Sequence, residues 1–124
     1  MKADDMIKAL EESGDYRILR RLNPRDVFET VASGQELKTG VIIDLETTGL
    51  DTATDEVIEI GLVKFAYLAG DRLALVVDTL GAFNEPTKPI PSEVAELTGI
   101  TAAMVAGHRI DPKAVTDFIS APRS

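Results

Sequence analysis

The sequence predicts an α/β fold, in which a helical extension precedes an antiparallel meander of three strands and several short helices. Three observations lead to this fold class. Apolar residues recur at helical spacing before residue 38, apolar and β-branched stretches joined by short turns follow, and prolines then separate short helical patterns. A chain of 124 residues suffices for one domain. We therefore expect a helical N-terminal extension over residues 1–38 and a single domain over residues 39–124.

The extension is expected to contain three short helices. Apolar residues at helical spacing predict the first over residues 6–10, which Gly14 would end. Residues 15–22 predict a second helix with Asp15 as its N-cap, and residues 27–31 predict a third.

Arginines give the extension a distinct charge pattern. Arg17, Arg20 and Arg21 would share one face of the second helix. The extension carries 7 basic and 8 acidic residues, so it is nearly neutral as a whole. A solvated face, or pairing with Glu11 and Glu12, is the favoured interpretation, and contact with nucleic acid is the alternative.

Strands are predicted in the middle of the chain. Val41 to Leu45 is a short apolar strand that we expect to be central in its sheet, and residues 57–68 and 72–80 form the next two. Residues 48–51 and 69–71 contain the Gly and Asp typical of turns. Because these connections are short, consecutive strands are expected to pair antiparallel.

Short helices are predicted in the rest of the chain. They cover residues 93–97, 102–106 and 112–119. Ser92 and Thr101 are the expected N-caps of the first two, and Gly99 ends the first. Pro112 suits the first turn of the last helix, where a missing N–H costs nothing.

Composition excludes several classes of protein. The chain has no cysteine, which excludes disulfides and thiolate metal sites. It has no apolar stretch long enough to cross a membrane and no secretory signal, so we expect a cytoplasmic protein with no membrane contact. The net charge of −8 argues against a protein that coats DNA. It is compatible with carboxylates that hold cations.

Asp44 and Glu46 are the candidate catalytic and metal-binding residues. Side chains two positions apart on a strand project from one face, so both carboxylates point the same way while Leu45 points to the other face. Carboxylate oxygens are the ligands that Mg²⁺ prefers, and a two-metal site can hydrolyse phosphodiesters. A bare Asp-x-Glu pattern alone is more often an ordinary strand end at the surface.

The residues that follow the pair make a binding role more specific. Thr47, Thr48, Gly49 and Leu50 are candidate substrate-binding residues, since a glycine lets the backbone approach a ligand closely. The acidic residues of the next turn are interpreted as solvated, namely Asp51, Asp55 and Glu56. Glu59 is interpreted as a structural or solvated residue of the second strand.

The run from Asp44 to Leu50 resembles the first motif of the DEDD exonucleases, in particular those similar to the proofreading epsilon subunit of bacterial DNA polymerase III. Residues 55–63 resemble the second strand of that family, and residues 89–101 resemble its first helix and the following loop. Order and spacing are preserved over residues 41–119. The resemblance implies an RNase H-like α/β fold, with this chain carrying its N-terminal half.

The resemblance also implies an activity, which is 3′→5′ hydrolysis at the single-stranded 3′ end of DNA with a DNA polymerase subunit as partner. Asp44 and Glu46 match the first two of four acidic ligands for two Mg²⁺ or Mn²⁺ ions. Glu93 and Thr98 match residues that contact the substrate nucleotide or the attacking water, and Leu50 resembles the apolar wedge beside the terminal base.

The chain departs from the family pattern in one important respect. The later motifs, with the remaining acidic ligands and the catalytic histidine, are not in the sequence, which stops near the expected fourth strand. His108, the only histidine, is interpreted as a surface residue. Residues 39–124 are therefore expected to be an incomplete exonuclease domain that is inactive alone.

Two alternatives stay open. The chain is also compatible with a non-catalytic remnant or interaction module, which would bind a partner through the edge of the meander. In the incomplete domain, the apolar strand Val41 to Leu45 would present an open edge, so we expect self-association or marginal stability unless a partner covers it. A phosphoryl-transfer enzyme of the haloacid dehalogenase type is disfavoured, because Glu46 stands where that pattern needs Asp.

Overall fold

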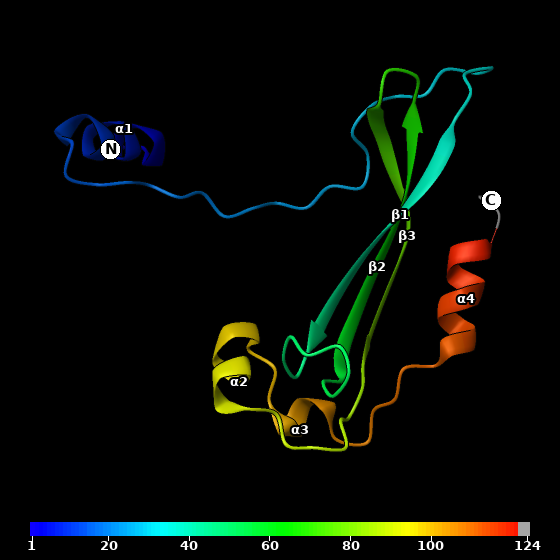
Figure 1. Cartoon of the computed structure of the whole chain (residues 1–124). Helices are drawn as coiled ribbons and strands as arrows, with labels where there is room; N and C mark the ends of the chain where they lie inside the picture. Colours follow the sequence, from blue (N-terminus) through cyan, green and yellow to red (C-terminus); the bar gives the residue numbers. More distant parts are fainter. Residues whose placement is uncertain (122–124) are drawn as a thin grey trace.

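A computed structural model describes residues 1–121 of the chain (Figure 1). Residues 122–124, the last residues of the domain expected over residues 39–124, lie outside these described residues. The elements in chain order are α1 (Ala3–Ser13), β1 (Lys38–Thr47), β2 (Val57–Leu68), β3 (Arg72–Phe83), α2 (Ser92–Thr98), α3 (Ala102–Val105) and α4 (Pro112–Ser120).

The three strands form an antiparallel sheet in the order β1-β2-β3, which confirms the predicted meander. Every second residue of β2 is buried, from Ile58 to Leu68, as expected for a middle strand with one face covered. Within the described residues, β1 pairs with β2 alone. From the sequence, residues 41–45 are expected to lie in the middle of the sheet. In the part of the chain that the structure describes, they lie at its edge instead, because β1 has a neighbouring strand, β2, on one side only.

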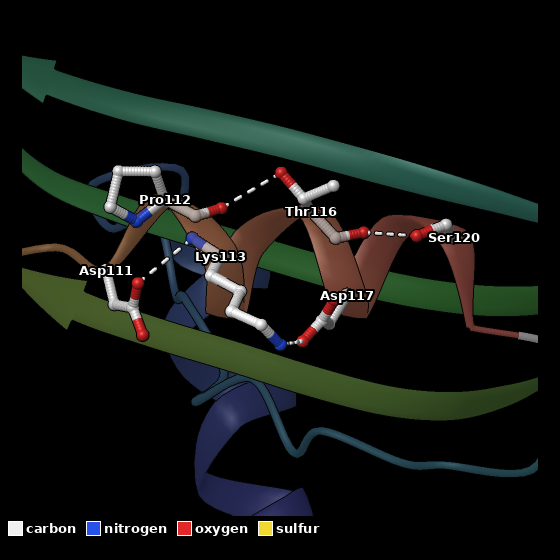
Figure 2. A network of polar contacts seen from close by, with 6 residues as sticks. All are labelled: Asp111, Pro112, Lys113, Thr116, Asp117 and Ser120. Carbon is white, nitrogen blue, oxygen red and sulfur yellow. Dashed lines mark hydrogen bonds and ion pairs between the residues drawn. The ribbon is translucent and has the colours of Figure 1, made fainter.

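Helix α4 lies along one face of the sheet (Figures 1 and 2). Lys64 of β2 is only 5% exposed on this face. Its Nζ donates to the Ala121 carbonyl at 2.8 Å and lies 5.1 Å from the centre of the Phe118 ring. Burial of this lysine is tolerated because its ammonium finds a carbonyl and an aromatic face.

Local hydrogen bonds define the ends of α4, as Figure 2 shows. Asp111 caps the helix by accepting from the Lys113 amide at 2.9 Å, and Pro112 occupies the first turn as predicted. Lys113 and Asp117, one turn apart, form an ion pair at 2.7 Å. The predicted last helix is thereby confirmed, with its end at Ser120.

A small core joins the short helices to the sheet. Ile58, Ile100 and Val105 are buried together, and the partly buried residues packed on them are Phe83, Ile90 and Val94. Gly99 ends α2 at φ 75°, as predicted. Ser92 is the first helical residue instead of the N-cap, because Pro91 takes that position without a side-chain hydrogen bond. Thr101 caps α3, accepting from the Met104 amide at 3.3 Å.

Only the first of the three helices predicted in the extension forms. Gly14 ends α1 at φ 79°, as expected. Residues 15–22 are irregular, with Leu19 82% and Leu22 85% exposed, since a short helix without a surface to pack on is marginal in water. The prediction of a helix there is wrong.

The third predicted helix is replaced by pairing with β3. Val27 forms an antiparallel bridge to Leu75, and the Val76 amide donates to the Asp26 carbonyl at 2.7 Å. An ion pair between Arg72 and Glu29 adds to this attachment. Residues 27–31 are rich in β-branched side chains, which favour extended structure. Their hydrogen bonds to the free edge of β3 therefore form in place of a helix, despite the helical spacing of the apolar residues. Among residues 1–121, no helix is long and apolar enough to cross a membrane.

Candidate functional site

Asp44 and Glu46 project from the face of the sheet opposite α4. Leu45, between them, lines a cavity of about 420 Å³ together with Ile60 and the α4 residue Val115. Because side chains alternate along β1, the two carboxylates point away from α4. The strand runs from Lys38 to Thr47, so both residues lie near its C-terminal end.

The positions directly across from Asp44 on β2 and β3 are glycines. Asp44 lies opposite Gly61 of β2, and Gly61 lies opposite Gly81 of β3. A Cβ atom built at either glycine would meet no heavy atom nearer than 4.0 Å, so neighbouring atoms would not exclude a larger residue at these positions. The pair of glycines instead leaves an open strip next to the carboxylate, with room for a ligand.

Glu59 brings a third carboxylate to the same face, directly opposite Glu46 in the β1–β2 register. Like charges in that position repel, which makes this end of the sheet locally unfavourable without a cation. The three acidic side chains do not converge, however. No group of three or more His, Cys, Asp or Glu side chains within residues 1–121 is placed to hold a metal ion.

The carboxylates of Asp44 and Glu46 are available for a ligand. Asp44 is exposed and Glu46 is half-buried. In the part of the chain that the structure describes, neither side chain makes a hydrogen bond or ion pair. Two carboxylates on one face suit a hard divalent cation, although a cation with six or more oxygen ligands would need further donors.

The turn after the pair is held by Thr48, which is only 4% exposed. Its Oγ1 donates to Asp55 Oδ1 at 2.9 Å and accepts from the Glu56 amide at 2.9 Å. The Thr48 amide donates to the Glu56 carbonyl, also at 2.9 Å. These bonds fix the direction in which the chain leaves the carboxylate pair.

The other predicted residues of this turn differ in exposure. The Thr47 hydroxyl donates to the Gly49 carbonyl at 2.6 Å. The side chain of Leu50 is 99% exposed, so the described residues cover almost none of it. The role of Leu50 as a wedge beside a terminal base stays a prediction.

Asp55 and Glu56 are not simply solvated, so this interpretation is corrected. Asp55 accepts from Thr48 Oγ1 and, at 2.8 Å, from the Asp51 amide. Glu56 accepts from the amide of Thr87 at 3.0 Å and from its hydroxyl, also at 3.0 Å, and the amide bond in particular lowers the pKa of Glu56. Nothing in the spacing of this acidic run indicated these structural roles.

Gly49 is required by the position of Asp55. A Cβ at residue 49 would lie 2.5 Å from Asp55 Oδ2, closer than packed atoms approach. From the sequence alone, Gly49 is predicted to let the substrate approach the backbone closely. The structure shows in addition that it makes room for the carboxylate that anchors the turn.

Glu93 and Thr98 lie on α2, which the small core attaches to the sheet through Val94 and Ile58. Glu93 is exposed in the first turn of the helix. The Thr98 hydroxyl donates to the Val94 carbonyl at 2.8 Å and accepts from the Ile100 amide at 3.1 Å. No bond joins these two residues to Asp44 or Glu46 within residues 1–121, so their role at the site stays a prediction.

Known proteins match this chain in sequence and in fold. The RNase_T exonuclease family model matches residues 41–121. A PolC-type DNA polymerase III of Thermotoga petrophila is 36% identical over 102 residues, which are 82% of this chain and 6% of that protein. Its counterpart from Caldanaerobacter subterraneus subsp. tengcongensis is 45% identical over 79 residues, or 64% of this chain and 5% of that protein.

A solved structure supports the same architecture. The crystal structure of a full-length 3′-exonuclease superposes with a TM-score of 0.50 at 20% identity, covering 93% of this chain and 36% of that one. At that identity the likeness concerns the fold, which is consistent with the predicted RNase H-like α/β class. The sequence match over residues 41–121 includes the carboxylate pair, the turn and α2. The chain belongs to the RNase_T exonuclease family, and its resemblance to the DEDD exonucleases is confirmed.

Proposed function

We propose that this chain carries a 3′→5′ exonuclease site that hydrolyses phosphodiester bonds at the single-stranded 3′ end of DNA. The observation that supports it most is the free Asp44 and Glu46 pair on one face of β1, inside the segment matched to the exonuclease family. The curated relatives are PolC-type DNA polymerases III, and the chain spans about 4–6% of their length. A role in replication or repair next to a polymerase subunit is part of this proposal.

Asp44 and Glu46 would hold the Mg²⁺ or Mn²⁺ ions expected for this family. The chemistry of the donors fits, since both are carboxylates with no competing partner among the described residues. Bound divalent cations would lower the pKa of a water and stabilise the leaving oxygen. Two carboxylates are few for two ions, so the chain as it stands should show little or no hydrolysis.

The surrounding residues would position the substrate. The strip at Gly61 and Gly81 leaves space for the terminal nucleotide next to Asp44. Leu50, 99% exposed, would contact its base, while Thr47, Thr48 and Gly49 would shape the backbone beneath the sugar. Glu93 and Thr98 on α2 would also contact the nucleotide or the attacking water.

The metal site can be tested by titrating the chain with Mn²⁺ and following free Mn²⁺ by electron paramagnetic resonance. We expect saturable binding that Asp44→Ala removes and that the control Asp51→Asn, in the neighbouring turn, retains. Equal binding by wild type and Asp44→Ala would refute the site.

The activity can be tested with end-labelled single-stranded DNA and Mg²⁺ or Mn²⁺. We expect little nucleotide release from the 124-residue chain. Robust release that Asp44→Ala abolishes would support the exonuclease site and contradict the expected inactivity. Robust release that Asp44→Ala leaves unchanged would refute the proposed site.

A second candidate function is that of an interaction module, because β1 presents an apolar edge. Ile42, Ile43 and Leu45 are 59%, 52% and 46% exposed. Exposed apolar edge strands readily pair with another chain. Antiparallel pairing of two copies about Ile42 would place Lys38 of each opposite Glu46 of the other, so the charges are complementary.

Sedimentation velocity of the purified chain tests this second candidate. We expect a dimer that Ile42→Lys converts to monomer, since a charged residue on an edge strand opposes pairing. Val27→Lys, a similarly exposed residue outside β1, serves as the control and should leave the dimer intact. A monomer at all concentrations would exclude self-association through this edge.

A further inference from the structure

The segment from Tyr16 to Arg25 is the most basic part of an otherwise acidic chain. It contains four arginines and no acidic residue, namely Arg17, Arg20, Arg21 and Arg25, whereas the whole chain has a net charge of −8. These arginines are 4 of its 13 basic residues. A polyanion is therefore attracted to this segment and repelled by most of the remaining surface.

The segment has few contacts of its own. It lacks regular secondary structure, and most of its apolar residues are exposed, with Tyr16 at 59%, Leu19 at 82% and Leu22 at 85%. Arg20 pairs with Asp4 at 3.3 Å, but both side chains are largely exposed, so the pair is weak. No ion pair involves Arg17 or Arg21 among the described residues, and the expected pairing with Glu11 and Glu12 does not form.

The end of the segment is fixed on the carboxylate side of the sheet. Arg25 lies 4.6 Å from the centre of the Phe28 ring. Phe28 lines an apolar cavity of about 390 Å³ with Ile42, Val63, Phe65, Leu73 and Val76. Ile42 precedes Asp44 by two positions on β1, so this cavity and the carboxylate pair share one face.

The segment therefore starts from the same face as the proposed site. Figure 1 shows it as an extended link that leaves the sheet and leads to α1. A strand whose 3′ end lies at Asp44 and Glu46 can run along this face, past Phe65, to reach Arg25. Residues 26–28 pair with the outer edge of β3 at the level of Gly40. That level lies about 14 Å from Asp44 along β1 and about 14 Å across the sheet, so the span to be bridged is about 20 Å, which requires several nucleotides of an extended strand.

We infer that residues 16–25 bind the phosphate backbone of single-stranded nucleic acid upstream of the 3′ end. The arginines neutralise phosphates without regard to sequence, and the exposed Tyr16 offers a ring on which a base can stack. This inference rests on the proposed function, because it takes the exonuclease substrate as the ligand. The irregular segment becomes ordered when the strand binds, as basic disordered segments do.

Fluorescence anisotropy of a labelled, 3′-blocked oligothymidylate in EDTA tests the inference without metal or hydrolysis. Four phosphate contacts to a single strand give a salt slope of about −2.8. Binding by wild type should therefore weaken about 50-fold between roughly 50 mM and 200 mM salt. The variant in which Arg17, Arg20, Arg21 and Arg25 are all changed to Gln should lose most of both the affinity and the slope.

Two further variants separate the segment from general charge. Changing Lys2, Lys8, Arg109 and Lys113 to Gln removes the same charge from exposed positions elsewhere and should leave binding nearly unchanged. Changing the four arginines to Lys should retain most of it. Equal loss of binding in the control and the arginine variant would overturn the inference, as would loss in the Lys variant equal to that in the Gln variant.

Two outcomes distinguish this inference from the proposed function. Binding that needs the arginines but is unaffected by Asp44→Ala would support it even if no hydrolysis is found. Hydrolysis that Asp44→Ala abolishes, with unchanged DNA binding in the arginine variant, would overturn the inference alone. Binding to phosphatidylglycerol vesicles in place of the oligonucleotide would also overturn it, in favour of an anionic membrane surface.

Discussion

Two pairs of carboxylates, about ten residues apart in the sequence, have opposite surroundings in the fold. Asp55 and Glu56 accept hydrogen bonds from Thr48, Asp51 and Thr87 and tie the turn together. Asp44 and Glu46 are in the adjoining strand, and their side chains make no hydrogen bond or ion pair within residues 1–121.

The difference shows which acidic residues stabilise the fold, and it leaves Asp44 and Glu46 free for the cation proposed above. Hydrogen bonds to the charged form stabilise a carboxylate in its native position, so Asp55 and Glu56 favour folding. Glu46, opposite Glu59, adds like-charge repulsion instead. A protein retains such an unfavourable arrangement where function requires it, which is consistent with a cation site.

The largest expected effect comes from removing Asp55. Asp55→Ala leaves the buried Thr48 hydroxyl and the Asp51 amide without their acceptor and should lower the free energy of unfolding by about 2–3 kcal/mol. Urea denaturation followed by circular dichroism measures this. Asp44→Ala makes the same chemical change in the strand and serves as control. An equal loss in both variants would contradict the distinction between the two groups.

Gly49→Ala should have the next largest effect. The new methyl group would lie 2.5 Å from Asp55 Oδ2 and displace the carboxylate that anchors the turn. We expect a loss of about 2 kcal/mol, typical of overpacking. Gly61→Ala is the matched control, since its methyl group would meet nothing nearer than 4.0 Å. Thermal unfolding of the two variants should differ clearly, and equal melting temperatures would show that the turn adapts to the added atom.

Most of the fold could be predicted from the sequence. The limits of β2 and the antiparallel order follow from local patterns, namely apolar β-branched stretches and short turns. The predictions failed in the extension. Residues 15–22 have the helical pattern but no surface to pack on, and residues 27–31 lie against the edge of β3, with which Val27 pairs. Both outcomes depend on contacts between distant segments, which no local pattern encodes.

The site could be predicted in part. Alternation along a strand is a local property, so it was possible to place Asp44 and Glu46 on one face before the structure was known. The opposition of Glu46 and Glu59 and the glycine strip at Gly61 and Gly81 depend on register between strands. The anchoring role of Asp55 depends on how the turn folds back, which explains why an acidic loop without distinctive spacing was interpreted as solvated.

A smaller effect is expected in the dependence of stability on pH. Hydrogen bonds from Thr87 lower the pKa of Glu56 below its ordinary value of 4.5. A depressed folded-state pKa contributes stability that is present above the unfolded value and is lost as the pH falls through the folded value. Glu56→Gln should therefore destabilise near neutral pH, and its difference from wild type should shrink from about pH 5 downward.

Urea denaturation at a series of pH values measures this difference. Glu96→Gln removes the same charge from an exposed position of α2 and controls for net charge. A difference between wild type and Glu56→Gln that stays constant down to about pH 3 would mean that the Thr87 bonds do not depend on the charge of Glu56.

The smallest effect on stability is expected at the carboxylate pair, and it should have the opposite sign. Glu46→Gln removes the repulsion from Glu59 and should raise the free energy of unfolding by about 0.2–0.5 kcal/mol in EDTA.

Addition of Mn²⁺ should stabilise wild type, because a ligand that binds only the folded state raises its stability. Differential scanning fluorimetry with and without Mn²⁺ should show this increase for wild type and not for Asp44→Ala. Destabilisation by Glu46→Gln, or an equal increase in Asp44→Ala, would mean that the pair belongs with Asp55 and Glu56 as part of the fold.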